Sequence, residues 1–180
     1  MKKAIVAVIA AMCAFPAVAQ INATGFITYV PNSSNFDYTI TLNNTGTTTI
    51  GTLWYSWVPG VDFMSALPTN LSAPAGWVGS VQGGSLGDGY STEFVASGPA
   101  SYLNAGLTLS GFKFTSSETP AQLAATSPIS PFLPTGTTFV YDGAPLIGLS
   151  HQFVITPVPE PVTLLVLAPA LLLMRRRNRV

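Results

Sequence analysis

His151 is the only histidine of the chain, so any serine or cysteine nucleophile would have to use it as its base. His151 alternates with Leu149 and Phe153, which predicts that it lies on the apolar face of a strand. The adjacent Ser150 must then point to the opposite face, so the two side chains cannot pair directly. This pattern favours a structural histidine over a catalytic one.

Residues 83–87, Gly-Gly-Ser-Leu-Gly, match the nucleophile-elbow pattern around Ser85. That motif works where a strand turns sharply into a helix and an acid and a histidine follow later in the chain. Here Asp88 and Gly89 come next, and residues 90–96 have the pattern of another strand. We therefore expect a glycine-rich loop without a catalytic serine.

Carboxylates are the remaining candidates for acid–base or metal chemistry. A glycosidase needs two carboxylates that converge in space, and the sequence does not select any two among Asp62, Asp88, Glu93 and Asp142. Calcium needs several oxygen ligands, and no second acid lies near Asp88 in the sequence. A single histidine and no cysteine in the mature chain exclude a zinc site built from those two residue types. Solvated loop acids are the favoured interpretation, with no catalytic residue, no metal and no cofactor, although a secreted hydrolase stays an alternative.

Aromatic residues are concentrated in residues 53–58, Leu-Trp-Tyr-Ser-Trp-Val. Alternation places these side chains on two faces, with Leu53, Tyr55 and Trp57 on one and Trp54 and Val58 on the other. A strand that is apolar on both faces is usually central and buried. The functional alternative is a platform on which sugar rings stack, formed by Trp54, Tyr55, Trp57 and Trp77. Solvent exposure of these rings discriminates between the two interpretations.

The elements that would position these side chains are strands, because period-two alternation dominates and helical periodicity is almost absent. Eight strands are expected, over residues 24–30, 36–43, 50–58, 76–81, 90–96, 107–114, 137–141 and 150–155. Thr119 and Pro120 predict one short helical turn through Ala125. Short strands, irregular links and no βαβ spacing predict an all-β antiparallel sandwich, Ig-like or jelly-roll.

The strand at 36–43 is followed by the turn sequence Asn43-Asn44-Thr45-Gly46, and then by the strand at 50–58. Asn-Thr-Gly between two such strands resembles the second and third strands of many bacterial Ig-like sandwich modules. The resemblance implies an Ig-like fold.

The N-terminus has the three parts of a secretory signal peptide. Met1-Lys2-Lys3 is a basic segment, an apolar segment follows, and Ala17-Val18-Ala19 is a small-x-small cleavage site. Residues 1–19 are therefore expected to be removed by signal peptidase after Sec export, leaving Gln20 first. Removal also takes away Cys13, the only cysteine, so the mature chain has no disulfide.

Charge is distributed unevenly along the chain. Between the two ends, residues 20–156 carry Lys113 as the only Lys or Arg against six acids, a formal charge of −5. This sign argues against nucleic acid and anionic membrane surfaces as partners. The length of this segment predicts one domain with room for a sizeable core.

The C-terminal residues 157–180 contain three parts in order. Val158-Pro159-Glu160-Pro161 lead into the uncharged run 162–174, and a basic cluster of Arg175, Arg176, Arg177 and Arg179 follows. Arginines next to an apolar segment stay in the cytoplasm, which puts the N-terminal side outside. Thirteen residues span about 20 Å as a helix against a hydrocarbon core of ~30 Å, so the run predicts a marginal transmembrane anchor.

This order resembles the PEP-CTERM sorting signal of Gram-negative bacteria, with the Pro-Glu-Pro tripeptide at residues 159–161. The apolar run is shorter than is usual in that family. The resemblance implies processing by the membrane enzyme exosortase, transient residence in the inner membrane, and delivery to the cell surface or extracellular matrix. It also implies a structural or adhesive role in a polysaccharide-rich envelope or biofilm, with exopolysaccharide as a partner, and the lack of a recognisable catalytic group makes a non-catalytic protein the expectation. A permanent tail anchor and a carbohydrate-binding module are the alternatives.

Overall fold

The protein, described here by a computed structural model over residues 18–85 and 88–159, is built from short strands. The strands are β1 (Ala23–Asn32), β2 (Asn35–Asn44), β3 (Thr52–Tyr55), β4 (Trp57–Val58), β5 (Val61–Asp62), β6 (Thr69–Ser72), β7 (Trp77–Gly83), β8 (Tyr90–Ala96), β9 (Thr108–Ser116), β10 (Thr137–Tyr141), β11 (Ser150–Val154) and β12 (Pro157–Pro159). A 3-10 turn (Pro99–Ser101) and helix α1 (Pro120–Ala124) complete the described elements.

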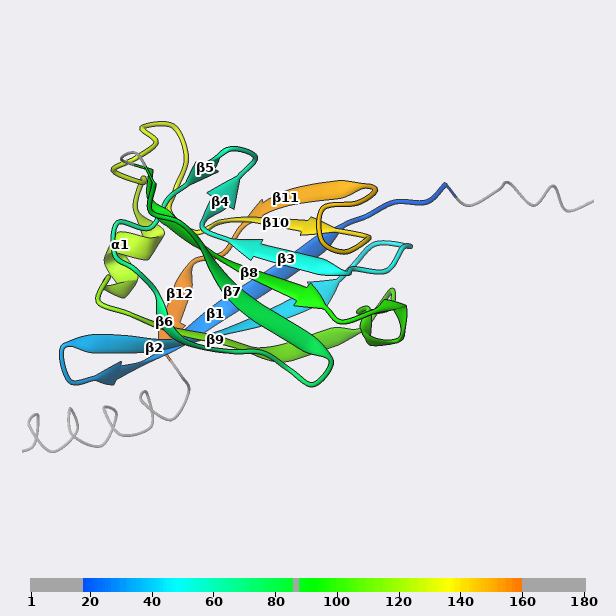
Figure 1. Ribbon diagram of the computed structural model, residues 1–180, viewed down its shortest axis with the longest axis horizontal. Helices are drawn as coiled ribbons and strands as arrows, with labels where there is room; N and C mark the ends of the chain where they lie inside the picture. The colour runs from blue at the N-terminus through cyan, green and yellow to red at the C-terminus, as the bar shows by residue number, and fades with distance from the viewer. Residues whose placement is uncertain (1–17, 86–87, 160–180) are drawn as a thin grey trace, which may run out of the picture.

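Two five-stranded sheets face each other across the core (Figure 1). The β2 sheet has the order β12-β1-β2-β9-β6, and the β3 sheet has the order β11-β10-β3-β8-β7. Strands β4 and β5 form a separate small hairpin. All neighbouring strands pair antiparallel except β12, which is parallel to β1. The expected all-β class with antiparallel sheets is confirmed for the described residues.

All eight expected strands are present, most with ends shifted by one or two residues. The expected strand at 50–58 is interrupted, because Ser56 adopts a left-handed φ of 65° and separates β3 from β4. Strands β5, β6 and β12 were not expected. They are two to four residues long and too short to carry a periodic pattern.

Helix α1 begins as the sequence predicts. The Thr119 side chain accepts a hydrogen bond from the Gln122 N–H, and the Gln122 side chain accepts one from the Thr119 N–H. This reciprocal capping box, with Pro120 in the first turn, satisfies backbone donors that a helix start leaves free. Leu123 then anchors the helix in the core, where it is fully buried.

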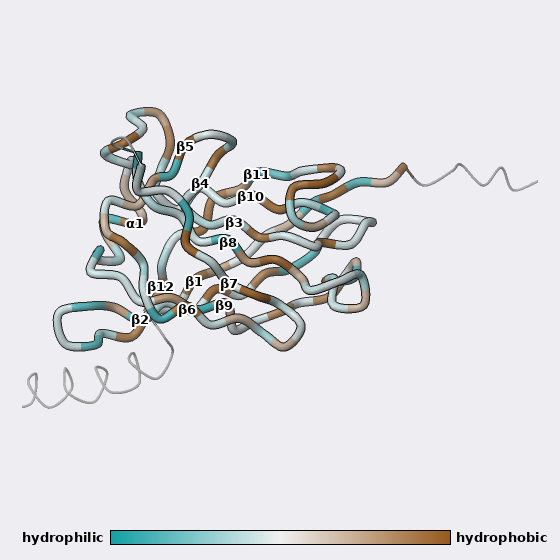
Figure 2. Tube along the Cα trace, viewed as in Figure 1, coloured by the Kyte–Doolittle hydropathy of each residue, from teal (hydrophilic) through white to brown (hydrophobic). Residues whose placement is uncertain are grey.

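The core between the sheets is rich in aromatic rings. Tyr38 and Phe114 stack at 5.1 Å, and Phe112 packs edge-on against Trp77 and Phe94 at 5.1 and 5.2 Å. Figure 2 shows hydrophobic stretches interspersed with pale and hydrophilic ones along the strands, as inward and outward positions require. The two sheets therefore bury their inner faces against each other and leave outer faces available for other uses.

The ends of the described chain lie at opposite ends of the sandwich (Figure 1). Near the first, the Gln20 carbonyl accepts from the Thr47 N–H and the Gln20 N–H donates to the Thr47 hydroxyl. At the other, β12 pairs Val158 with Thr28 on the edge of β1. The described residues therefore begin at Val18, within the expected signal cleavage site, and end at Pro159, the first residue of the tripeptide motif.

Most of the targeting segments lie outside the described residues. These are Ala17 and the residues before it, and Glu160, Pro161, the apolar run and the arginine cluster after Pro159. Among residues 18–85 and 88–159, no helix has the length and apolar character needed to cross a membrane.

Candidate functional site

His151 lies on edge strand β11, opposite Val140, with its ring stacked on Phe153 at 5.9 Å. The expectation that His151 and Phe153 share a face is thereby confirmed. No hydrogen bond joins His151 to another side chain in the described parts of the chain. Ser85 follows strand β7, and the chain returns as strand β8 without a helix between them. The strand-to-helix context that a nucleophile elbow requires is thus absent from this connection, of which residues 86–87 lie outside the description.

The acids of the β5 region are closer together than the sequence indicated. The Asp88 Oδ1 accepts a hydrogen bond from the Asp62 N–H at 3.2 Å, so the expectation that no second acid lies near Asp88 holds in the sequence but not in space. Burial, and secondarily the charge of Asp88, raises the pKa of the Asp62 carboxyl. Within the described residues, no group of three His, Cys, Asp or Glu side chains is placed to hold a metal ion.

The other two acids considered as catalytic candidates serve their own loops and strands. Glu93 accepts from the Gln82 side chain at 2.8 Å across β7 and β8. Asp142 accepts from the Leu149 N–H at 2.9 Å and thereby closes the β10–β11 connection. Both carboxylates therefore stabilise the local structure around them.

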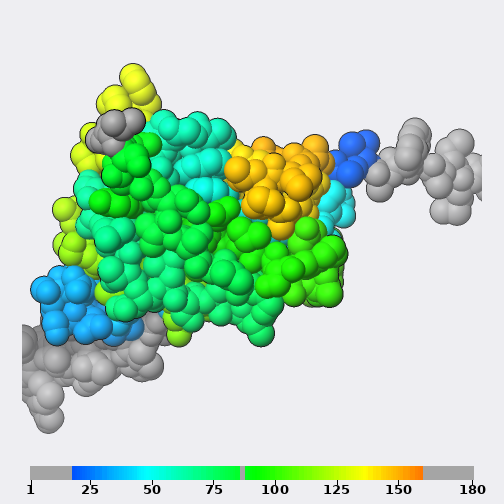
Figure 3. Space-filling model, in the orientation of Figure 1, coloured from blue at the N-terminus to red at the C-terminus, as the bar shows by residue number. Residues whose placement is uncertain are grey.

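The aromatic run on β3 and β4 is buried. Trp54 and Trp57 are 6% and 8% exposed, and their rings stack at 4.2 Å. Phe139 of β10 packs edge-on against Trp57 at 5.6 Å. We call Trp54, Trp57 and Phe139 the tryptophan cluster; it lies outside the main core, on the outer side of the β3 sheet. Figure 3 shows this side of the molecule, with β7, β8, the β4–β5 hairpin and the β10–β11 hairpin closely packed.

The expectation that Trp57 shares a face with Tyr55 is wrong. Tyr55 points into the core and contacts Phe114 at 5.5 Å, whereas Trp57 covers Trp54 on the other side. The left-handed Ser56 between them breaks the alternation and turns Trp57 over.

The last candidate for glycan stacking, Trp77, is 6% exposed and belongs to the core. Its indole N–H donates to the Ser101 carbonyl at 2.9 Å, so its polar atom is satisfied inside the protein. Tyr55 is fully buried. The burial of all four rings favours packing over an exposed sugar platform.

A buried polar centre lies where β9 meets helix α1. The Ser65 N–H donates to Glu118 Oε1 at 2.6 Å, and the Tyr38 hydroxyl donates to the Glu118 carbonyl at 2.7 Å. Burial is the largest cause that raises the pKa of the Glu118 carboxyl and of the Tyr38 and Tyr55 hydroxyls. A cavity of about 230 Å³ adjoins Glu118 and Gln122. The carboxylate fastens the loop after β5 to the end of β9, which is a structural role.

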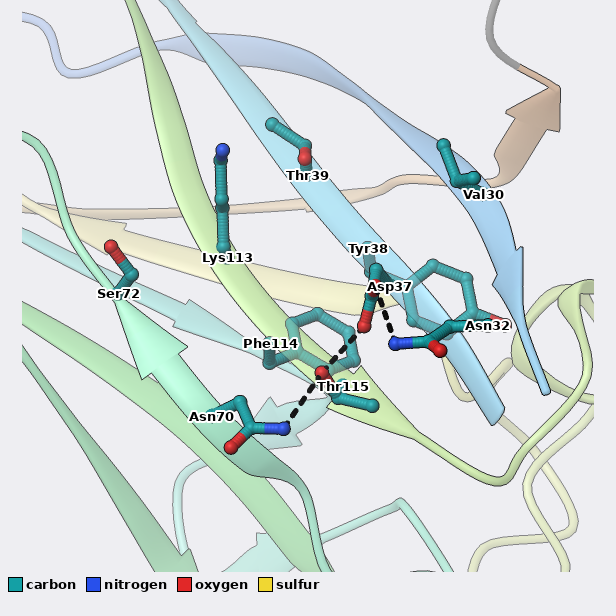
Figure 4. Close-up of a pocket in the computed structure, with 10 residues that line it drawn as sticks. All are labelled: Val30, Asn32, Asp37, Tyr38, Thr39, Asn70, Ser72, Lys113, Phe114 and Thr115. Carbon is teal, nitrogen blue, oxygen red and sulfur yellow. Dashed lines mark hydrogen bonds between the residues drawn. The ribbon is translucent and has the colours of Figure 1, made fainter. Parts of the chain in front are cut away.

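A polar pocket of about 490 Å³ lies on the outer face of the β2 sheet (Figure 4). We call it the outer pocket. Strands β1, β2, β9 and β6 contribute to its lining, and its polar side chains are Asn32, Asp37, Thr39, Asn70, Ser72, Lys113 and Thr115.

The outer pocket is not predicted by the sequence, although one signal for it is present there. The strand at 36–43 puts Asp37 and Thr39 on its polar face, and Lys113 is the only basic residue of the exported segment. What was missing was the pairing: Thr39 lies opposite Lys113, and Lys113 lies opposite Ser72. These partners are separated by more than 40 residues, and periodicity does not specify such contacts.

Comparison with known proteins leaves the family open. No protein-family model matches the chain, and no curated protein matches it. Two solved structures of the GH20 exo-β-N-acetylglucosaminidase of Vibrio harveyi are similar in part, one of an inactive mutant and one in complex with N-acetylglucosamine. Their identities are 12% and 11%, with TM-scores of 0.44 and 0.43. Each match covers 76% of this chain and 18% of the longer enzyme chain.

Proposed function

We propose that this is an exported, non-catalytic surface or matrix protein, sorted by its C-terminal PEP-CTERM signal and processed by exosortase. The observation that carries the proposal is strand β12, which brings residues 157–159 onto the edge of β1 immediately before Glu160. The last described strand therefore includes Pro159, the first residue of the tripeptide motif.

The short sequence between β12 and the apolar run supports this proposal. Only Glu160 and Pro161 separate β12 from the apolar run that starts at Val162. Two residues span at most about 7 Å even when fully extended. A domain tethered so closely stays at the outer surface of the inner membrane until the chain is cut. Cleavage beside Glu160 then releases the domain with all of its described strands.

The other end of the domain agrees with export by Sec and removal of the signal by signal peptidase. The hydrogen bonds between Gln20 and Thr47 attach the chain to the domain immediately after the expected cleavage site at Ala19. The exported domain then carries the −5 charge of residues 20–156, which disfavours nucleic acid as a partner. Exopolysaccharide of the envelope or biofilm is the partner class we propose for a structural or adhesive role.

Carbohydrate binding by stacked aromatics receives no support from the geometry, because Trp54, Tyr55, Trp57 and Trp77 are all buried. A secreted hydrolase built on paired acids is also the weaker candidate. Asp88, in the connection between β7 and β8, accepts a hydrogen bond from the backbone N–H of Asp62 on β5, and Asp62 is only 8% exposed.

The proposal is tested with Glu160→Ala in the source bacterium, followed in membrane and extracellular fractions with an antibody to the domain. We expect the variant to accumulate in the membrane fraction, because the processing motif is lost while β12 is kept. Val154→Thr is the matched control: it changes a half-exposed side chain of β11, lies outside the sorting segment, and is expected to be released normally. Equal release of Glu160→Ala and the wild-type protein would contradict the sorting proposal.

A further inference from the structure

The outer pocket is organised in two rows of side chains that cross the β2 sheet. In one row, Asp37 on β2 lies opposite Thr115 on β9. In the other, Thr39 on β2 lies opposite Lys113 on β9, and Lys113 lies opposite Ser72 on β6. The rows are two residues apart along the strands, or about 7 Å. The pocket thus has a carboxylate row and, two residues further along the strands, an ammonium row.

A local irregularity in β6 shapes the pocket. Thr69 pairs with Thr115 and Ser72 pairs with Lys113, so β6 uses three steps where β9 uses two. The extra residue is accommodated by Asn70, which has a left-handed φ of 51°. Bulges re-aim side chains and are frequent at binding sites. Here the bulge directs the Asn70 amide to the Thr115 hydroxyl at 3.4 Å while Leu71 packs against the core.

The carboxylate row is held in place by a chain of hydrogen bonds, visible in Figure 4. Asn32 Nδ2 donates to Asp37 Oδ2 at 2.9 Å, and the Thr115 hydroxyl donates to Asp37 Oδ1 at 2.7 Å. Asn70 Nδ2 in turn donates to Thr115. Each carboxylate oxygen still has a lone pair for an incoming hydroxyl. The row is therefore a fixed set of acceptors, suited to a ligand that brings O–H donors.

The ammonium row has the opposite character. Lys113 is the only Lys or Arg among the described residues and makes no ion pair or hydrogen bond there. It extends between Thr39 and Ser72, whose hydroxyls are also without hydrogen-bond partners in the described chain. A solitary cation with two free hydroxyls is suited to an anionic group. The formal charge of −5 on residues 20–156 disfavours a dense polyanion, so one negative charge per docked unit fits best.

We infer that the outer pocket binds a sugar acid, with the carboxylate of a hexuronate unit at Lys113 and its ring hydroxyls at the Asp37 row. A ligand with one carboxylate and several hydroxyls about a ring width away matches both rows at once. This inference adds a ligand class to the proposed surface role. It does not depend on how the tail is processed, so failure of binding leaves the sorting proposal standing.

The test uses a matched pair of probes, methyl β-glucuronide and methyl β-glucoside, which differ in the carboxylate at C6. The mature ¹⁵N-labelled protein, isolated from whichever fraction of its source bacterium contains it, is titrated with each probe and followed by NMR shifts. We expect shifts in residues 37–39 and 113–115, and an affinity for the glucuronide at least about tenfold higher, as a charge-assisted hydrogen bond supplies.

Three variants decide the assignment. Lys113→Gln should abolish the preference for the glucuronide, and Lys113→Arg should retain it. Thr108→Ala, on the same strand but outside the pocket, should leave both affinities unchanged. Unchanged spectra outside the pocket verify that Lys113→Gln is folded.

Four results would overturn the inference. They are equal affinity for the two sugars, a preference that survives Lys113→Gln, no shift with either sugar, and inorganic phosphate binding as tightly as the glucuronide. The last result would make the pocket a simple anion site.

Discussion

The outer faces of the two sheets differ in what covers them. On the β3 sheet, Trp57 turns back over Trp54 and both rings are almost fully buried. On the β2 sheet, no aromatic pair among the described residues covers Asp37 and Lys113, which line a pocket of about 490 Å³. The residues that looked most suited to ligand binding in the sequence are therefore used for packing, and the accessible site is made of ordinary polar side chains.

In both places a left-handed residue sets the outcome. Ser56, with φ of 65°, ends the alternation of β3 and closes the tryptophan cluster, whereas Asn70, with φ of 51°, bulges β6 and shapes the outer pocket. The same backbone conformation thus helps to cover the outer face of the β3 sheet and helps to shape the pocket on the outer face of the β2 sheet. The difference lies in the side chains that follow. Trp57 follows Ser56, whereas the partly buried Leu71 follows Asn70 and packs against the core, so that Asn70 faces outward.

The largest expected effect is on the sealed face. Trp54→Ala should lower the free energy of unfolding by about 3–5 kcal/mol, because it leaves a cavity under Trp57. Phe26→Ala is the matched control on the open face, where Phe26 is 45% exposed, and it should cost far less. The measurement is urea unfolding of both variants. Similar costs for the two would mean that the faces do not differ as described.

The next effect concerns the two left-handed residues. Ser56→Val and Asn70→Val should each cost about 1–2 kcal/mol or more, because a branched Cβ is strained at positive φ. The glycine variants at the same positions are the controls and should be tolerated, since glycine adopts this conformation freely. Urea unfolding gives both values. Valine variants as stable as the glycine variants would contradict the assigned backbone conformation.

The stability of the fold should depend on pH through two buried acids, Glu118 and Asp62. Burial raises the pKa of the Glu118 and Asp62 carboxyls, so the folded protein binds more protons than the unfolded chain between the ordinary and the raised values. These groups contribute stability that is fully present below their ordinary pKa and is lost as pH rises through the folded pKa.

The check is the pH dependence of unfolding between about pH 4 and pH 7, a window that starts near the ordinary carboxyl pKa values. Glu118→Gln and Asp62→Asn should each reduce the loss of stability that the wild-type protein shows as pH rises. A steeper loss in either amide variant would contradict the direction of the shift.

The smallest expected effect is on the open face. Thr39→Ala should change stability by no more than about 0.5 kcal/mol, because the hydroxyl has no hydrogen-bond partner among the described residues. The same variant should weaken glucuronide binding, since the hydroxyl lies in the ammonium row beside Lys113. A large loss of stability would assign Thr39 to the fold and not to the pocket.

Much of the fold is predictable from the sequence because inward and outward positions alternate. The strand at 36–43 and the capping box at Thr119 both form as their patterns predict. Strand β12 was missed because Pro157 and Pro159 disfavour strands, and they are tolerated there because β12 is at an edge.

The outer pocket was not predictable for a different reason. The polar face of the strand at 36–43 is readable, but its pairing with β9, and that of β9 with β6, are long-range contacts. The positive φ of Ser56 and Asn70 is also not encoded by a glycine at either position. The strands are therefore predictable from local sequence patterns, whereas the outer pocket depends on tertiary contacts between distant segments.

The most direct test of the central claim is the intact mass of the native protein, measured separately in membrane and extracellular fractions of its source bacterium. We expect a species that begins at Gln20 and ends within residues 159–161, at or just after the end of strand β12. A membrane-bound species that still ends at Val180, with none released, would contradict it and make the tail a permanent anchor.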